Sequence, residues 1–375
     1  MISSILTLAV AFLSLILLMV IHEFGHFIIA KKFGIRVDEF GIGYPPRLFG
    51  KKIGETIYSI NLLPLGAFVR IYGEEGGVDD YRSFMGLKIW KRVLIVIGGV
   101  AAFWLTAIII FSVVFAIGTD LPVGDQDAQG LAAQVKVIGV TADSPAGQAG
   151  LKMGDAIVNV KISGSNIKIN KIADFQKITN ENKGKEITLT IDRQGEIFDV
   201  SLTPRILAPE GQGPVGIALE RIATLIEKYP WYQAPWQGAI YTWQTTVNAL
   251  AGLYQVLANL VSGKGTPEGA AFAGPLGITV FLANAASYGA GFFLYFIGII
   301  CVFIAIFNLF PIPALDGGKL IFLLIEKIKG KPVSVKVEQS ITVAFFILLI
   351  ALSIFITIRY DIPRFTDFLK SSLQN

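Results

Sequence analysis

Histidine and cysteine are almost absent from this 375-residue chain, which contains two histidines and a single cysteine, Cys301. One cysteine cannot form an intrachain disulfide, so a disulfide framework and a redox-active cysteine pair are excluded. Charged residues are also scarce, at 16% against 53% hydrophobic residues. No lysine or arginine run alternates with aromatic residues, which argues against a nucleic-acid partner despite the net charge of +4. This balance is typical of an integral membrane protein with some soluble mass.

Four apolar segments are each long enough to cross a bilayer, and they lie at about 4–28, 92–117, 291–312 and 339–358. The first lacks a basic start and a small-residue cleavage site, so we predict a permanent helix rather than a signal peptide. Lysine and arginine gather in the loop 29–91 and in the loop after the third segment. By the positive-inside rule both loops are cytoplasmic, which places the N-terminus, residues 119–290 and the C-terminus outside.

Both histidines lie in one motif at the inner end of the first segment, His22-Glu23-Phe24-Gly25-His26. Four residues apart on a helix, the two imidazoles project from neighbouring turns of one face and can bind one Zn²⁺. Glu23 can then reach a water on the metal and act as a general base. The alternative is a pair of polar residues near a helix end that have this spacing by accident. Ionisable residues at membrane depth are costly, which favours the metal site of a zinc peptidase.

The loop after the first segment contains two stretches rich in β-branched and aromatic residues, Thr56–Leu62 and Ala67–Tyr72. The turn Leu63-Pro64-Leu65-Gly66 separates them, which predicts a β-hairpin on the same side of the membrane as the histidines. The hairpin edge could hold an extended peptide as an added strand. A hairpin that only caps the helices is the alternative. The candidate substrate contacts on this edge are Gly66, Ala67, Phe68 and Val69.

From residue 119 the composition becomes that of a soluble α+β domain. Alternating apolar residues predict strands at Val135–Val140, Ile157–Ile162, Glu186–Asp192 and Ile197–Leu202. The stretch Ser144–Ile157 combines a short helix stopped by glycine with a Gly-Asp turn, and it resembles a PDZ domain. This resemblance covers 119–206 and implies a groove that binds peptide termini or strands. A small β-module used as a spacer or size filter is the alternative.

Residues 207–290 are predicted to link this domain to the second half of the membrane core. Aromatic residues that favour a membrane interface occur here at Tyr229, Trp231, Tyr232 and Trp236. Gln237–Val261 is predicted to be a helix that lies along the outer leaflet or packs on the bundle. Phe272–Ala286 contains Gly274-Pro275 and is too short to span the bilayer.

The third apolar segment ends in a stretch from Asn308 to Gly318 that contains Pro311 and Pro313. Two prolines at alternate positions forbid a regular helix, so the backbone is predicted to unwind here. Unwound backbone at membrane depth lines a cavity or is buried in protein. Asp316 is the one carboxylate in this stretch, and its oxygen suits the third zinc ligand that the histidines lack. An ordinary helix N-cap is the alternative role for Asp316.

These motifs together resemble the site-2 protease family of intramembrane zinc metalloproteases, and within it the bacterial regulator-of-sigma-E protease branch. The resemblance covers nearly the whole chain, from the HEFGH motif through the hairpin loop and one PDZ-like insert to Asn308-Leu-Phe-Pro-Ile-Pro-Ala-Leu-Asp316-Gly. It implies zinc bound by His22, His26 and Asp316, with Glu23 as the catalytic base. It also implies substrate contact by Asn308 and strand pairing of the substrate on the hairpin. We count Pro311 and Pro313 of the unwound stretch among the candidate substrate contacts.

Two features depart from the family pattern. Gly98-Gly99 and Ala102 stand where the family often has Gly-Pro followed by Asn, so a polar substrate contact is missing. The chain also has room for one PDZ-like domain, whereas Gram-negative relatives carry two.

The sequence therefore predicts an α-helical polytopic membrane protein with four transmembrane helices, a membrane-associated β-hairpin and an inserted PDZ-like α+β domain. Residues 1–118 and 291–375 form the two halves of a protease core in the bacterial cytoplasmic membrane, with the active site near the cytoplasmic side. The predicted partners are the lipid bilayer, a peptide or protein ligand of the PDZ-like domain, and single-span membrane proteins such as anti-sigma factors or remnant signal peptides.

Two other classes of function are considered. A catalytically silent membrane scaffold that keeps zinc for structure needs no base and usually closes all four positions of the metal, so Glu23 argues against it. A metal or solute transporter predicts inverted repeats and several charged residues across its spans, and neither is evident in the sequence.

Overall fold

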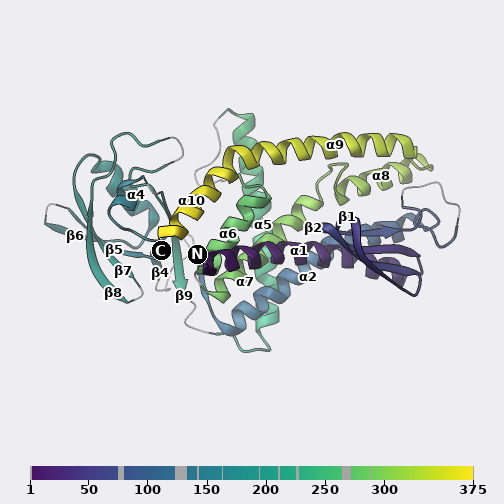
Figure 1. Ribbon diagram of the computed structural model, residues 1–375, viewed down its shortest axis with the longest axis horizontal. Coiled ribbons are helices and arrows are strands. Elements are labelled where there is room, and N and C mark those ends of the chain that lie inside the picture. Colours follow the sequence, from purple (N-terminus) through teal and green to yellow (C-terminus); the bar gives the residue numbers. More distant parts are fainter. Residues whose placement is uncertain are drawn as a thin grey trace.

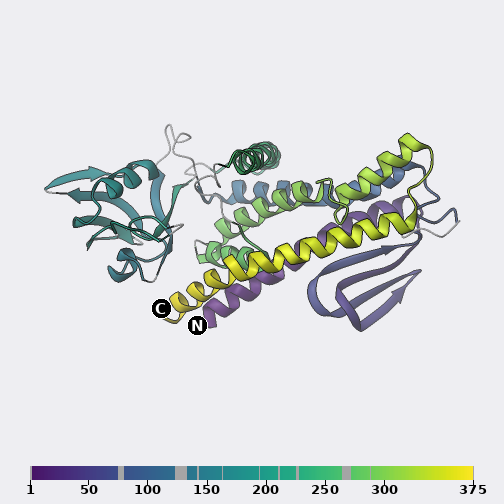
Figure 2. The same ribbon diagram turned by 90° about the horizontal axis from the view of Figure 1, so that it is seen from above.

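The structure is a computed structural model that describes residues 2–74, 80–122, 133–141, 143–162, 164–193, 195–209, 212–224, 228–263, 272–287 and 289–374. The molecule is elongated, with a seven-stranded sheet at one end, a group of helices in the middle and a smaller two-strand sheet at the other end (Figure 1). The start of α1 and the C-terminal helix α10 both lie at the end nearest the seven-stranded sheet (Figures 1 and 2).

Within the described ranges, four helices are long and apolar enough to cross a membrane, which confirms the four predicted segments. They are α1 Ile2–Lys32, α2 Ile89–Ile117, α7 Ala290–Asn308 and α9 Val335–Ile356. Helix α7 ends four residues earlier than expected, at Asn308, because Pro311 and Pro313 cannot continue it. Helix α9 continues through a π-helical turn, η1 Thr357–Asp361, into α10 Ile362–Gln374.

Helices α1, α2 and α7 share one apolar core. Its centre is formed by fully buried residues of α2 and α7, including Val100, Phe103, Phe111 and Val302. The crossing of α1 and α2 is close because glycines face each other: a Cβ on Gly25 would lie 2.3 Å from the carbonyl oxygen of Gly98.

Shorter helices flank this core. Helix α5 Ala234–Val261 packs on α2, which confirms the helix predicted at Gln237–Val261, and the short α6 Pro275–Ser287 packs on α1. Helix α8 Asp316–Lys329 follows the unwound stretch after α7 and contacts α2.

The seven-stranded sheet has the order β3-β9-β4-β5-β7-β8, with β6 paired to β5. Its strands are β3 Asp120–Pro122, β4 Ala133–Val140, β5 Ala156–Ile162, β6 Ser165–Lys168, β7 Ile187–Arg193, β8 Glu196–Leu202 and β9 Ile217–Thr224. Helices α3 Pro145–Gln148 and α4 Ile172–Glu181 pack on it through Ala146, Phe175 and Ile178. Residues 217–224 were expected in the linker after residue 206, but they form β9 and pair with β3 and β4, because Ile217 and Leu219 pack against this core.

The predicted hairpin is wrong in its pairing. Strands β1 Val37–Ile53 and β2 Thr56–Ile71 are both long, and each folds back on itself. Residues 67–71 pair with 37–42, whereas 56–60 pair with the other side of 39–42 and also with 47–53. The two halves of β2 are therefore separated by β1. Gly66, with φ +152°, does allow the expected turn, but a turn does not determine which strand lies beside it.

Candidate metal centre

Three side chains that are distant in the sequence meet where α1 and α8 approach each other. The Nε2 atoms of His22 and His26 lie 3.2 Å apart. The Oδ2 atom of Asp316 lies 3.3 Å from Nε2 of His22 and 3.5 Å from Nε2 of His26. The three side chains are only 10–13% exposed. The structure thus brings together the three residues that the sequence singled out as metal ligands.

These distances test whether the donor set fits a zinc ion. Ligand atoms that lie 2.0–2.1 Å from a tetrahedral zinc are about 3.3–3.4 Å from one another. The three observed separations, 3.2, 3.3 and 3.5 Å, bracket this value. Two imidazole nitrogens and one carboxylate oxygen are also donors that zinc accepts. Among the described residues the cluster has three donors, which leaves one position of a tetrahedral ion open.

Hydrogen bonds and ring contacts hold the imidazoles in the orientation that a metal needs. Nδ1–H of His26 donates to the carbonyl oxygen of Ile95 on α2, at 2.8 Å. This bond places the proton on Nδ1 and leaves the lone pair of Nε2 for a metal. The ring of His22 stacks on Phe103, with 4.8 Å between the ring centres.

Gly99 makes the room that this arrangement requires, a role that the sequence analysis missed. A Cβ at Gly99 would lie 2.3 Å from Nε2 of His26 and 2.6 Å from Cε1 of His22. Real Cβ atoms essentially never approach another atom this closely. The one signal for this role in the sequence is Gly98-Gly99, the only glycine pair in α2. Such a pair predicts close helix packing and does not indicate a metal site.

Asp316 owes its position to the unwound stretch that precedes it. The loop after α7 folds over Gly317 and Gly318, and a Cβ on either would lie within 2.4 Å of loop backbone. Asp316 is the first residue of α8, and the N-cap is Leu315 without a side-chain bond. The N-cap role considered for Asp316 is therefore wrong, and its Oδ2 instead faces the two imidazoles.

Glu23 lies between the histidines in sequence and contacts the edge of the smaller sheet. The backbone N–H of Val69 donates to Oε2 of Glu23, at 3.1 Å. Residues 67–71 have a described strand partner on one side only, and Val69 points its N–H toward the other side. This free edge of the sheet therefore faces the carboxylate beside the metal ligands.

The other candidate substrate contacts have different surroundings. Gly66 packs near Sδ of Met19 on α1, and Phe68 stacks on Tyr44 with 6.3 Å between ring centres. Ala67 is buried. Asn308 ends α7, eight residues before Asp316, and no hydrogen bond of its side chain to the three ligands is found in the described part of the chain. Pro311 is exposed and Pro313 is half-buried in the loop between them.

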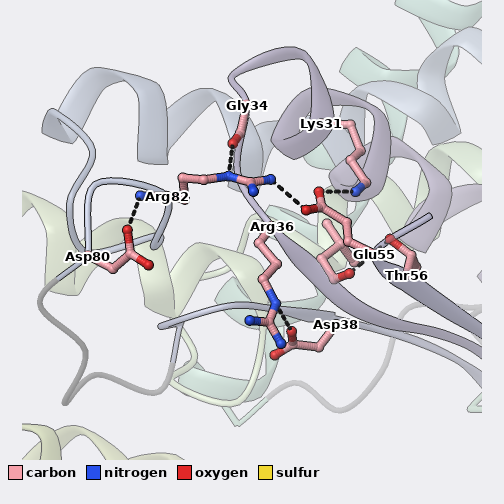
Figure 3. Close-up of polar contacts among 9 residues, drawn as sticks. Lys31, Gly34, Arg36, Asp38, Glu55, Thr56, Asp80 and Arg82 are labelled. Atoms are coloured by element: carbon pink, nitrogen blue, oxygen red, sulfur yellow. Dashed lines mark hydrogen bonds and ion pairs between the residues drawn. The ribbon is translucent and has the colours of Figure 1, made fainter.

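Ion pairs join the smaller sheet to the end of α1. Glu55, at the turn between β1 and β2, accepts bonds from Lys31 at 2.7 Å and from Arg82 at 2.6 Å (Figure 3). Arg82 also donates to the carbonyl oxygen of Gly34, and Thr56 Oγ1 donates to that of Val37 (Figure 3). These contacts set the sheet beside the histidine motif. The sequence pointed to Lys31 and Arg82 only as basic residues of the loop 29–91, and it did not single out Glu55.

Comparison with known proteins agrees with this geometry. The family model described as Peptidase family M50 matches residues 10–352. Three relatives share the name "Putative zinc metalloprotease". CPE1693 of Clostridium perfringens is 34% identical over 349 residues, which cover 93% of this chain and 96% of the relative. CA_C1796 of Clostridium acetobutylicum is 33% identical over 359 residues, covering 95% and 97%. The Nostoc sp. relative all3971 is 30% identical over 359 residues, covering 94% of each chain.

Proposed function

Because the chain belongs to peptidase family M50 and is therefore a zinc metalloprotease, we propose that it cleaves single-span membrane proteins within or near the bilayer. His22, His26 and Asp316 would hold the zinc ion. The distances between their ligand atoms are the main support for this proposal. Three protein ligands with one open position are typical of catalytic zinc, whereas structural zinc usually has four.

Bound zinc would polarise the scissile carbonyl and lower the pKa of water towards about 7. Glu23 takes the proton from the attacking water and returns it to the leaving amine as the peptide bond breaks. The His26–Ile95 hydrogen bond keeps the imidazole in one orientation throughout. Asn308 lies at the end of α7, and its amide would donate a hydrogen bond to the oxyanion that develops.

The substrate must be extended where it is cut, because a helix shields its carbonyl groups. The free edge at residues 67–71 can hold the substrate in an extended conformation, because the substrate can pair with it as a further strand. In a strand, alternate residues direct their N–H and C=O groups to the same side, so Ala67 and Ile71 present theirs as Val69 does. An added substrate strand would compete with Glu23 for the N–H of Val69 and so free the carboxylate for catalysis.

The setting in the membrane supports this choice of substrate. His22 and His26 lie in the second half of α1, and Asp316 begins α8. The smaller sheet lies beside the C-terminal half of α1, and the seven-stranded sheet lies at the opposite end of the molecule (Figure 1). With the basic loop 29–91 in the cytoplasm of a bacterium, the seven-stranded sheet is extracytoplasmic. We propose that this sheet is PDZ-like, and that it binds a peptide or excludes bulky ectodomains. Suitable substrates would be single-span membrane proteins whose extracytoplasmic part has already been removed, such as anti-sigma factors, or remnant signal peptides.

Purified full-length protein and a model single-span substrate test the proposal, with zinc content measured on each sample. The wild-type protein should cleave, and a chelator should stop cleavage until zinc is restored. Glu23→Gln should bind one zinc per chain and lose activity by a factor of about 1,000 or more, because it removes the base while leaving the ligands. Full turnover by this variant would refute the assignment of Glu23.

A further inference from the structure

Helix α8 carries a second charged residue on the side of Asp316. Lys319 lies three residues after Asp316, which places both side chains on one face of the helix. The ammonium group of Lys319 donates to the carboxylate of Glu74, in the loop that follows β2. The Lys319 side chain is 44% exposed and that of Glu74 is 20% exposed, so water reaches this pair only in part.

Nearby carboxylates determine the charge state of Lys319. Burial lowers the pKa of Lys319, but the carboxylates of Glu74, Asp316 and Glu23 outweigh this effect, and the pKa lies above its ordinary value. Lys319 therefore stays charged and can form an ion pair with Glu74.

Glu74 is joined to the free edge of the smaller sheet by a tight turn. Its N–H donates to the carbonyl oxygen of Ile71, at 3.2 Å, across Gly73 at φ +71°. The backbone of Tyr72, next to Ile71, is also held. Its N–H donates to the carbonyl oxygen of Arg36 at 3.0 Å, and its carbonyl oxygen accepts from the N–H of Phe84 at 2.8 Å. A displacement of Glu74 therefore shifts the end of the 67–71 segment.

Three contacts thus form a ring around the site. The histidines of α1 approach Asp316 of α8, Glu23 of α1 binds Val69 of the sheet edge, and Glu74 beside this edge binds Lys319 of α8. We propose that the Lys319–Glu74 pair is a positioning clasp that sets the substrate-binding edge at a fixed distance from the metal-ligand helix. This inference rests on the proposed peptidase function.

A different ion pair already holds α8 in the fold. Arg92 of α2 binds Glu326 of α8 through both of its terminal nitrogens, and these side chains are 5% and 14% exposed. This deeper pair joins two helices of the core, and it approaches the sheet edge only through Phe84, whose ring centre lies 6.0 Å from the Arg92 guanidinium. It provides a control for the loss of an ion pair on α8, because it lies on the same helix and has the same charge types.

The test is a double-mutant cycle in the full-length protein, with Lys319→Met, Glu74→Gln and both together. Each single variant should raise KM for a single-span substrate about five- to tenfold with kcat within about twofold, since binding geometry is lost rather than the chemical groups. The double variant should have the same KM as either single variant. Lys319→Arg should keep the wild-type KM. Arg92→Met/Glu326→Gln should leave KM unchanged.

Hydrogen–deuterium exchange provides a readout that needs no catalysis. Amides of residues 67–72 should exchange about five- to tenfold faster in Lys319→Met and in Glu74→Gln, and at the wild-type rate in Lys319→Arg and in the Arg92/Glu326 control. Unchanged exchange together with an unchanged KM in both single variants would overturn the clasp. A fall in kcat confined to Lys319→Met, with additive effects in the double variant, would also overturn it. Absence of cleavage by the wild-type protein would instead refute the peptidase function, and the exchange data would still decide whether the clasp exists.

Discussion

Gly99→Ala is the sharpest test of the metal centre, because it adds one methyl group and removes no functional group. The added Cβ would lie 2.3 Å from Nε2 of His26, which is 1.1 Å inside the ordinary contact limit of 3.4 Å. Either an imidazole or helix α2 must therefore move by about 1 Å. Functional sites keep their geometry only when side chains are displaced by less than about 0.5 Å. We therefore expect zinc affinity to fall by about 100-fold or more, which corresponds to about 2.8 kcal/mol.

Zinc affinity can be measured by competition with a chromophoric chelator, and the metal content by mass spectrometry of the purified full-length protein. Gly252→Ala on α5 is the matched control, because nothing lies within 4 Å of a Cβ there. Gly98→Ala separates packing from metal binding: its Cβ meets Gly25 backbone at 2.8 Å, so it should lower the unfolding temperature. If Gly99→Ala bound zinc with wild-type affinity and cleaved normally, the proposed ligand geometry would be refuted.

Three further outcomes are expected. Asp316→Ala should reduce zinc affinity by about 100-fold or more, because it removes one of three ligands, and one bound zinc at wild-type affinity would contradict the ligand set. Val69→Pro removes the N–H that faces Glu23 and should raise KM about tenfold with zinc content unchanged, whereas an unchanged KM would argue against strand addition. Burial raises the pKa of Glu220 on β9 from 4.5 to about 6, so the folded sheet binds a proton more tightly than the unfolded chain. Its stability should then fall by about 2 kcal/mol in total as the pH rises from about 3 to about 7.5, with the steepest loss between the two pKa values. Pulse proteolysis in urea should show this loss in the wild type and not in Glu220→Gln, and a pH-independent wild type would contradict the reasoning.

The sequence alone predicts the parts of this protein that depend on neighbours along the chain. The spacing of His22 and His26 places them on one helix face whatever the rest of the fold. Length and hydrophobicity predict the four long helices, which the structure confirms. The prolines after Asn308 predict the unwound stretch.

Tertiary structure decided whatever depends on segments far apart in the chain. Local patterns could not place residues 39–42 between the halves of β2, because strand partners are chosen by packing rather than by turns. The need for glycine at Gly99 arises only where α2 meets the histidines. The pairing of Lys319 with Glu74 likewise joins residues 245 positions apart. Helix periodicity and hydrophobicity act within one element, whereas the distance between two elements depends on the side chains that both of them bury.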